Sequence, residues 1–187
     1  MQRRHCAITL FLATAVVCFS LDLISKYVVA DWVAGSGGEV VIIPGWLSFI
    51  TRLNPGGMWS FLHQLGATAN TLLAIFSCIA ALAILLWALL GLRAGDRLFA
   101  LILGMVFGGA LGNLYDRLVF HGVRDFIDAH YEEVYHFPTF NLADSFLVVG
   151  ASCLVLGSMF HRTPAEQASS SIDEEGAPTE DNATSSA

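Results

Sequence analysis

The sequence predicts an all-α polytopic membrane protein: four transmembrane helices with a small extracytoplasmic β-sheet and a short interfacial helix. Three observations predict this class. Of the 187 residues, 55% are hydrophobic and only 13% are charged, whereas soluble domains carry about 25% charged residues. Four apolar stretches are long enough to cross a bilayer as helices. A β-prone stretch that contains tryptophans lies between the first two of them.

The four spans are expected at about residues 7–29, 66–92, 98–118 and 141–160. The second lies in a stretch, 64–92, that contains no charged residue. All four must be helical, because lipid offers no hydrogen-bond partner to backbone groups. The cysteines show no pairing pattern along these spans and are expected to be buried thiols; they are Cys6, Cys18, Cys78 and Cys153.

The first span is expected to be retained, although its start resembles a signal peptide. Arg3 and Arg4 precede an apolar run, and Cys18 invites a lipoprotein-type cleavage interpretation. Bulky Val17 stands where such a cleavage site has a small residue, and the apolar run continues to Val29. A membrane helix therefore fits this segment better.

The segment 30–63 is predicted to contain a β-hairpin. Val40–Ile43 and Leu47–Leu53 are β-prone runs separated by the turn dipeptide Pro44-Gly45. The apolar residues in 58–65 suit a short helix on the membrane surface. An ordinary lipid-facing loop fits the composition of 58–65 equally well.

The net charge of −7 comes almost entirely from the C-terminal tail. Residues 163–187 contain six acidic and no basic residues, so the rest of the chain, with nine basic and ten acidic residues, is near neutral. We expect one membrane domain, 1–162, followed by a disordered acidic cytoplasmic tail, 163–187. The sequence contains no basic stripe that would indicate binding to nucleic acid.

Basic residues near the span ends favour cytoplasmic termini, because five of them would then lie on the inner side of the membrane and four on the outer side. The five on the inner side would be Arg3, Arg4, Arg93, Arg97 and Arg162, and the four on the outer side Lys26, Arg52, Arg117 and Arg124. This orientation brings the unusual polar residues of the spans to one level, the membrane–water boundary on the side away from the cytoplasm. They are Asp22, Lys26, Asn113, Asp116, Arg117, Asn141 and Asp144.

Three aspartates are candidates for acid–base chemistry at that level: Asp116, Asp125 and Asp144. An ionisable residue in or beside a span is costly and marks a functional site by default. Asp116 directly precedes Arg117, and we expect these two to form a structural ion pair. Asp125 and Asp144 would then be free to titrate, with one ionised to activate water and the other protonated to donate a proton. Such a pair needs no metal.

Two other functions are weighed against a carboxylate pair. A zinc peptidase could use histidines and a glutamate of the loop after the third span, but the His-Glu-x-x-His helix pattern is absent there; the candidates are His121, His130, Glu133 and His136. A proton-coupled transporter could also keep acids in its spans. The acids lie at one boundary, however, and none lies partway through the membrane to relay a proton.

Five segments resemble the lipoprotein signal peptidase (signal peptidase II) family. Three of them follow one another after the second span, at Gly108–Leu118, Gly122–Asp128 and Phe140–Ser145. The first span contributes Asp22-Leu-Ile-Ser-Lys26, and the outer loop contributes Asn54-Pro-Gly-Gly-Met-Trp-Ser60. The resemblance covers about residues 8–160. It departs from the family pattern at 55–59, where altered packing around the substrate's lipid is expected.

The resemblance implies a bacterial aspartic endopeptidase of the inner membrane that cuts diacylglyceryl-prolipoproteins before the lipidated cysteine. Asp125 and Asp144 match the catalytic pair. The lining or supporting positions are matched by Asn54, Asn113, Asp116, Arg117, Asn141, Asp22 and Lys26. We expect no cofactor, partners limited to the prolipoproteins and membrane lipid, and a monomer.

Overall fold

The computed structural model describes residues 2–56, 67–93, 95–132 and 134–160. Two compact units divide the chain, Met1–Leu154 and Val155–Ala187, and the second is described only over 155–160. The element order is α1 (Gln2–Gly35), β1 (Glu39–Ile43), β2 (Leu47–Asn54), α2 (Ala67–Gly91), α3 (Arg97–Val119), β3 (Val123–Tyr131), β4 (Tyr135–His136) and α4 (Leu142–Phe160). The predicted surface helix in 58–65 and the tail 163–187 lie outside the described residues.

Four helices of the described residues are long and apolar enough to cross a membrane, which confirms the predicted spans. They are His5–Gly35, Thr68–Gly91, Arg97–Val119 and Leu142–Met159. The first is longer than predicted, because α1 continues beyond Val29 to Gly35. Val29 and Val33 pack against Phe126 of β3, so contact with the sheet holds these last turns in helical form.

Helix α3 packs closely against α1 through its glycines. A Cβ built at Gly104 would lie 2.6 Å from the carbonyl oxygen of Phe11, and one at Gly108 would lie 2.6 Å from that of Ala15. Only residues without a side chain permit this approach, which is the usual device for packing helices in lipid. The rings of Phe11 and Phe107 also contact each other, tilted by 35° with centroids 5.3 Å apart.

The apolar core joins α1, α2 and α3. Its buried residues are Ala7, Phe11 and Ala15 from α1, Ala81, Ala88 and Leu92 from α2 and its end, and Ala100, Leu103 and Phe107 from α3. Helix α4 meets α3 at Gly109, where a Cβ would lie 2.7 Å from the carbonyl oxygen of Ala143. The N-terminal turn of α4 is thereby held beside the end of α3 that carries the polar residues.

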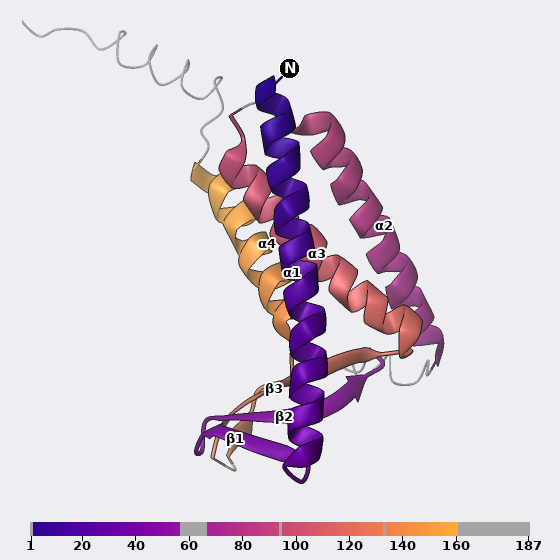
Figure 1. Ribbon diagram of the computed structural model, residues 1–187, viewed down its shortest axis with the longest axis vertical. Helices are drawn as coiled ribbons and strands as arrows, with labels where there is room; N and C mark the ends of the chain where they lie inside the picture. The colour runs from indigo at the N-terminus through magenta and orange to yellow at the C-terminus, as the bar shows by residue number, and fades with distance from the viewer. Residues whose placement is uncertain (1, 57–66, 94, 133, 161–187) are drawn as a thin grey trace, which may run out of the picture. The chain divides into compact units, whose positions relative to one another are not determined.

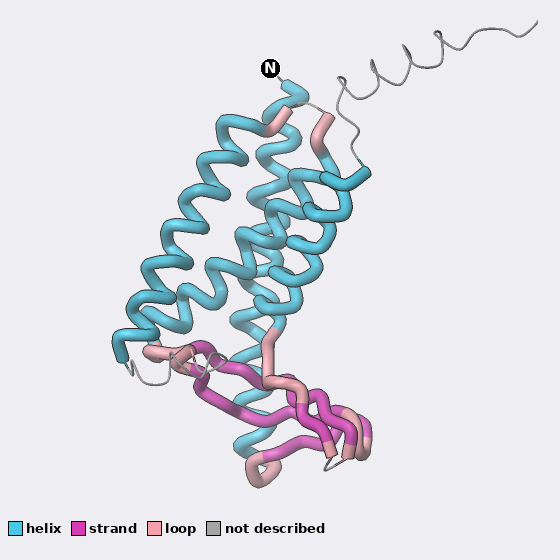
Figure 2. The backbone as a smooth tube through the Cα atoms, turned by 180° about the vertical axis from the view of Figure 1, so that it is seen from behind, coloured by secondary structure: helices cyan, strands magenta, loops and turns pink. Residues whose placement is uncertain are grey.

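The strands form one antiparallel sheet in the order β1-β2-β3-β4. Figures 1 and 2 show the strands gathered beside the C-terminal end of α1. The predicted hairpin is confirmed, since β1 and β2 are joined by the turn at Pro44-Gly45 with Val40 opposite Phe49. The sequence analysis missed β3 and β4. Strand β3 pairs with β2, with Asp125 opposite Arg52.

The expectation of buried thiols is wrong for three of the four cysteines. Cys18 is buried, whereas Cys6, Cys78 and Cys153 are exposed on the outer faces of their helices, and all four are free thiols. Cysteine is a small apolar residue that is compatible with either face of a span. Spacing along an almost uniformly apolar helix could not distinguish these faces.

Candidate active site

Lys26, the only lysine of the chain, lies buried among carboxylates at the sheet end of α1. Its Nζ is 2.7 Å from Asp22 Oδ2 on the same helix and 3.0 Å from Asp116 Oδ2 on α3. All three side chains are fully shielded from solvent. A buried charge needs a paired partner, and one cation between two anions meets this requirement for the helix pair α1–α3.

Asp116 binds Arg124 instead of Arg117, so the ion pair predicted from their adjacency is wrong. Arg124 donates from Nη2 and Nε to Asp116 Oδ1, at 2.8 and 3.1 Å, and its backbone N–H donates to Oδ2 at 3.0 Å. Adjacent residues of a helix point in different directions, whereas a strand can bring a distant residue face to face. Arg124 also stacks over the rings of Tyr27 and Phe120, at 4.4 and 4.1 Å.

The N-terminus of α4 is closed by a reciprocal cap between Asn141 and Asp144. The backbone N–H of Asp144 donates to Asn141 Oδ1 at 3.0 Å, and the backbone N–H of Asn141 donates to Asp144 Oδ2 at 3.2 Å. This is the pattern of a capping box, with an acid three residues after the cap. The next free N–H of the helix, that of Ala143, donates to Asp22 Oδ1 at 2.9 Å.

Asp125 comes from β3 and is only 2% exposed. Two asparagine amides hold its carboxylate: Asn141 Nδ2 donates to Oδ1 at 2.7 Å and Asn54 Nδ2 donates to Oδ2 at 3.0 Å. Asn54 is itself fixed, because its Oδ1 accepts from the backbone N–H of Gly56 at 2.9 Å. Asp125 is therefore positioned jointly by β2 and by the start of α4.

Asn113 of α3 joins the two aspartate groups. Its Nδ2 donates to Asp144 Oδ1 at 2.7 Å, while its Oδ1 accepts from Lys26 Nζ and from Asn141 Nδ2, both at 3.3 Å. One unbroken set of hydrogen bonds consequently runs from the buried lysine to both Asp125 and Asp144. Amides suit this position because each both donates and accepts.

Arg117 lies beside this network without joining it. Its Nε and Nη1 are buried and make no hydrogen bond within the described residues. The guanidinium is within electrostatic reach of Asp144 and Asp125. Its backbone oxygen accepts from Asn70 Nδ2 of α2 at 3.1 Å, which anchors the end of α3 to α2. Arg117 thus presents unused donors near the carboxylates.

Burial in this apolar setting raises the pKa of Asp125 to about 6, and the negative charge of Asp144 acts in the same direction. The amides of Asn54 and Asn141 and the charge of Lys26 lower it in part. A pKa near neutrality is what general acid–base catalysis requires of a carboxyl group. The arrangement can therefore hold a proton on Asp125 close to a second carboxylate.

The structure brings together all nine residues that the sequence analysis singled out, with Arg117 at the margin. Two contributors were missed, Arg124 and Asn70. Arg124 had been counted only among the basic residues of the outer side, and Asn70 gives no signal within an uncharged span. Among the described residues, this network includes no histidine or cysteine that could hold a zinc ion.

Four helices of membrane-spanning character, with a buried carboxylate at Asp125 and a half-buried one at Asp144, define a class, the polytopic membrane enzymes. The sequence model of the signal peptidase (SPase) II family matches residues 14–160. The chain belongs to this family, so the predicted resemblance and the prediction of an enzyme are confirmed, and the transporter alternative is not favoured.

Relatives and solved structures agree with this assignment. The chain is 36% identical to the lipoprotein signal peptidase of Pseudomonas aeruginosa over 154 residues, covering 82% of this chain and 89% of the relative. It is 36% identical to that of Polynucleobacter necessarius over 152 residues, covering 80% and 88%. A solved bacterial membrane enzyme superposes with a TM-score of 0.65 at 26% identity, covering 81% of this chain and 94% of that one.

Proposed function

We propose that the chain removes signal peptides from diacylglyceryl-prolipoproteins in the bacterial inner membrane, with Asp125 and Asp144 as the catalytic pair. The observation that carries the proposal is the placement of Asn141, which binds Asp125 through its side-chain amide and caps the helix that begins at Asp144. The two carboxyl groups are thereby held at one site by separate elements. Relatives of this chain in the family bear the name lipoprotein signal peptidase.

The two aspartates take opposite roles at the start of the reaction. Asp144 accepts hydrogen bonds from Asn113 and from the backbone at the N-terminus of α4, a position that stabilises negative charge. It acts as the base that takes a proton from the attacking water. Burial raises the pKa of Asp125 to about 6, so this group supplies the proton to the carbonyl oxygen of the scissile bond.

The remaining polar residues support the pair. Asn54 and Asn113 orient one carboxylate each, while Lys26 and Arg124 balance the charges of Asp22 and Asp116 at the base of the site. Arg117 faces the substrate, and its buried donors bind a carbonyl oxygen of the peptide or of the lipid ester next to the cut. No cofactor takes part, and the enzyme acts as a monomer.

Both termini lie in the cytoplasm in this proposal, and the site lies on the opposite side of the inner membrane, at the boundary between lipid and water. The polar network occupies the C-terminal ends of α1 and α3 and the N-terminal end of α4, so all of it lies at one level. Lipidated cysteines are anchored at such a boundary, where the cut falls. The peptidase domain, 1–162, is followed by the acidic tail on the cytoplasmic side.

The test is cleavage of a diacylglyceryl-prolipoprotein peptide by the purified full-length chain. Asp125→Asn and Asp144→Asn should each lower kcat at least about 10³-fold, in the upper part of the range for acid–base groups. Asp31→Asn is the matched control, because Asp31 is an exposed acid outside the network. Normal turnover by either site variant would overturn the catalytic pair. Turnover by the wild type of an unlipidated peptide at the same rate would overturn the substrate class.

A further inference from the structure

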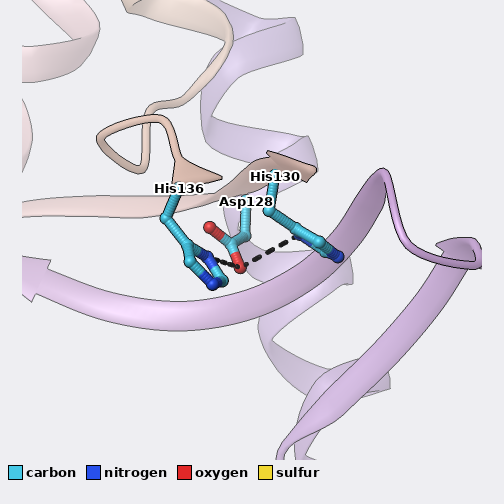
Figure 3. Close-up of side chains that lie close together, drawn as sticks. All are labelled: Asp128, His130 and His136. Carbon is cyan, nitrogen blue, oxygen red and sulfur yellow. Dashed lines mark ion pairs between the residues drawn. The ribbon is translucent and has the colours of Figure 1, made fainter. Parts of the chain in front are cut away.

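A second cluster of ligating side chains lies on the sheet, apart from the carboxylate network. It consists of Asp128 and His130 of β3 and His136 of β4. Asp128 Oδ2 is 3.5 Å from His130 Nδ1 and 3.7 Å from His136 Nδ1, and Figure 3 shows both rings directed at the same carboxylate oxygen. The ligand atoms of the three residues all lie within 4.8 Å of one another.

The backbone dictates this convergence. His130 and His136 are directly opposite each other in the β3–β4 register, so their side chains leave the sheet on the same face. Asp128 is two residues before His130 on the same strand and therefore shares that face. No element has to move to bring the three together. A ligand set fixed by register is already formed before any ion binds.

The strands around the cluster are fixed from both sides. The backbone N–H of His130 donates to the carbonyl oxygen of Trp46 at 2.9 Å, and that of Glu132 donates to Gly45 at 2.8 Å. The backbone N–H of Phe137 donates to Ala129 at 2.8 Å. The turn between β1 and β2 thus holds the end of β3, and the segment after β4 is held against it as well.

The separations fit a tetrahedral metal ion. Zinc–nitrogen and zinc–oxygen bonds of about 2.0–2.1 Å place neighbouring tetrahedral ligands about 3.3 Å apart. The two ligand-to-ligand distances of 3.5 and 3.7 Å exceed this by a few tenths of an ångström, which small side-chain rotations can remove. Two imidazoles with one carboxylate suit Zn²⁺, Cu²⁺ or Ni²⁺, whereas Ca²⁺ and Mg²⁺ prefer oxygen ligands alone.

One buried nitrogen of the cluster lacks a hydrogen bond. His130 Nδ1 is buried, and it makes no hydrogen bond within the part of the chain that the structure describes. A buried polar atom without a hydrogen bond is unfavourable, and a coordinated cation would satisfy it. The His136 side chain, 53% exposed, leaves a path from solvent to the cluster. The histidine rings are stacked with centroids 5.3 Å apart.

From the shared face, the distances and the buried nitrogen that makes no hydrogen bond, we propose that Asp128, His130 and His136 bind one divalent transition-metal ion, with Zn²⁺ as the representative. Water completes its coordination. The ion has a structural role in the sheet and takes no part in the peptidase reaction, because the carboxylate network is complete without it. It pins β4 to the strand that carries Asp125 and so stabilises the sheet end of the protein. This inference does not depend on the proposed catalytic pair.

The test measures Zn²⁺ binding by isothermal titration calorimetry. It uses the purified full-length chain, without an affinity tag, in detergent micelles. The wild type should bind one Zn²⁺ per chain. His130→Gln and His136→Gln should each weaken binding at least about tenfold, since each removes one ligand. His121→Asn is the matched control: it also removes one histidine, it lies outside the cluster, and asparagine tolerates its positive φ of 59°.

A second measurement identifies the ligands directly. With Cu²⁺ as the probe, electron paramagnetic resonance should show coupling to two imidazole nitrogens in the wild type and in the His121 variant. It should show coupling to one nitrogen in the His136 variant, whose exposed position tolerates substitution without loss of the fold. Absence of saturable Zn²⁺ binding by the wild type would overturn the proposal. So would equal binding by all three histidine variants.

Discussion

The side-chain amide of Asn141 donates to Asp125 Oδ1 at 2.7 Å, and its carbonyl oxygen accepts the backbone N–H of Asp144 at 3.0 Å. One residue thus orients the carboxylate of a strand and starts the helix that carries the other carboxylate. Helix capping and positioning of the site are therefore coupled through a single side chain, and substitutions at this residue can separate the two.

Asn141→Ala should lower both activity and stability. It removes the amide that holds Asp125 and the cap of α4, and loss of an N-cap costs about 1 kcal/mol. Asn141→Ser keeps an oxygen that can cap the helix, but its side chain is too short to reach Asp125. We expect the serine variant to melt close to the wild type in bicelles while kcat stays reduced about tenfold or more. Full activity of the serine variant would contradict the positioning role.

The pH dependence of cleavage should report the proton on Asp125. Burial raises the pKa of this group to about 6, and the proposed mechanism needs it protonated. The value of kcat/KM should therefore fall as the pH rises above about 6, approaching tenfold per pH unit in the free enzyme. The titration belongs to the pair and not to one residue. A flat profile of kcat/KM between pH 5 and pH 8 would rule out a protonated Asp125 as the starting acid.

The pH dependence of the free energy of unfolding should report the proton on Asp125 independently of activity. Because the pKa of Asp125 is raised from 3.8 to about 6, the folded protein keeps a proton there that the unfolded chain has lost. This contribution is fully present below the unfolded value and is lost as the pH rises through about 6. Relative to Asp125→Asn, the wild type should lose on the order of 2 kcal/mol between pH 4 and pH 7. Thermal unfolding of both proteins across this range measures it, with Asp31→Asn as the control.

Lys26→Met should destabilise the protein strongly. The substitution leaves the carboxylates of Asp22 and Asp116 buried without their shared cation, and breaking a buried pair in this way costs about 3–5 kcal/mol. Removing one of those carboxylates as well, in the double variant Asp22→Asn with Lys26→Met, should recover part of the loss. Thermal unfolding measures both effects. A double variant no more stable than the single one would contradict the charge argument.

Gly108→Ala should weaken the contact between α1 and α3. The added methyl group would lie 2.6 Å from the backbone oxygen of Ala15, so the helices must separate. Gly157→Ala is the matched control, because a Cβ there meets nothing within 4 Å. The control should be neutral or gain up to about 1 kcal/mol from helix propensity. Equal melting temperatures for the two variants would refute close packing at Gly108.

The spans and the first hairpin could be predicted from sequence because each leaves a local pattern. Long apolar runs predict spans, and two β-prone runs around Pro44-Gly45 predict a hairpin. Strand β3 leaves no such pattern, since Arg124, Asp125 and Asp128 interrupt its apolar residues. Its formation depends on pairing with β2 and on the contact of Phe126 with α1. These are tertiary effects that a single segment does not reveal.

The members of the site could be predicted, but not all of their pairings. Convergence of the acids followed from span direction alone. Asn113, Asn141 and Asp144 do meet, and Asp116 is joined to them through Lys26. The partner of Asp116 could not be derived in the same way. Arg117 is adjacent to it in sequence, yet Arg124 reaches it from β3 with two guanidinium bonds and one backbone bond. A strand that was not predicted cannot supply a predicted partner.

Asp22 and Lys26 lie one turn apart on the same helix, 2.7 Å from each other. During synthesis, α1 leaves the ribosome and reaches the membrane before α3 and its carboxylates exist. An unpaired lysine in a span disfavours insertion, by about 2.5–3.5 kcal/mol at the bilayer centre and by less toward the boundary at which Lys26 lies. The neighbouring aspartate lets this helix carry its own counterion during insertion, and Lys26 is then already positioned to donate to Asn113 and to pair with Asp116. The same contact that anchors the finished site thus also eases its biogenesis.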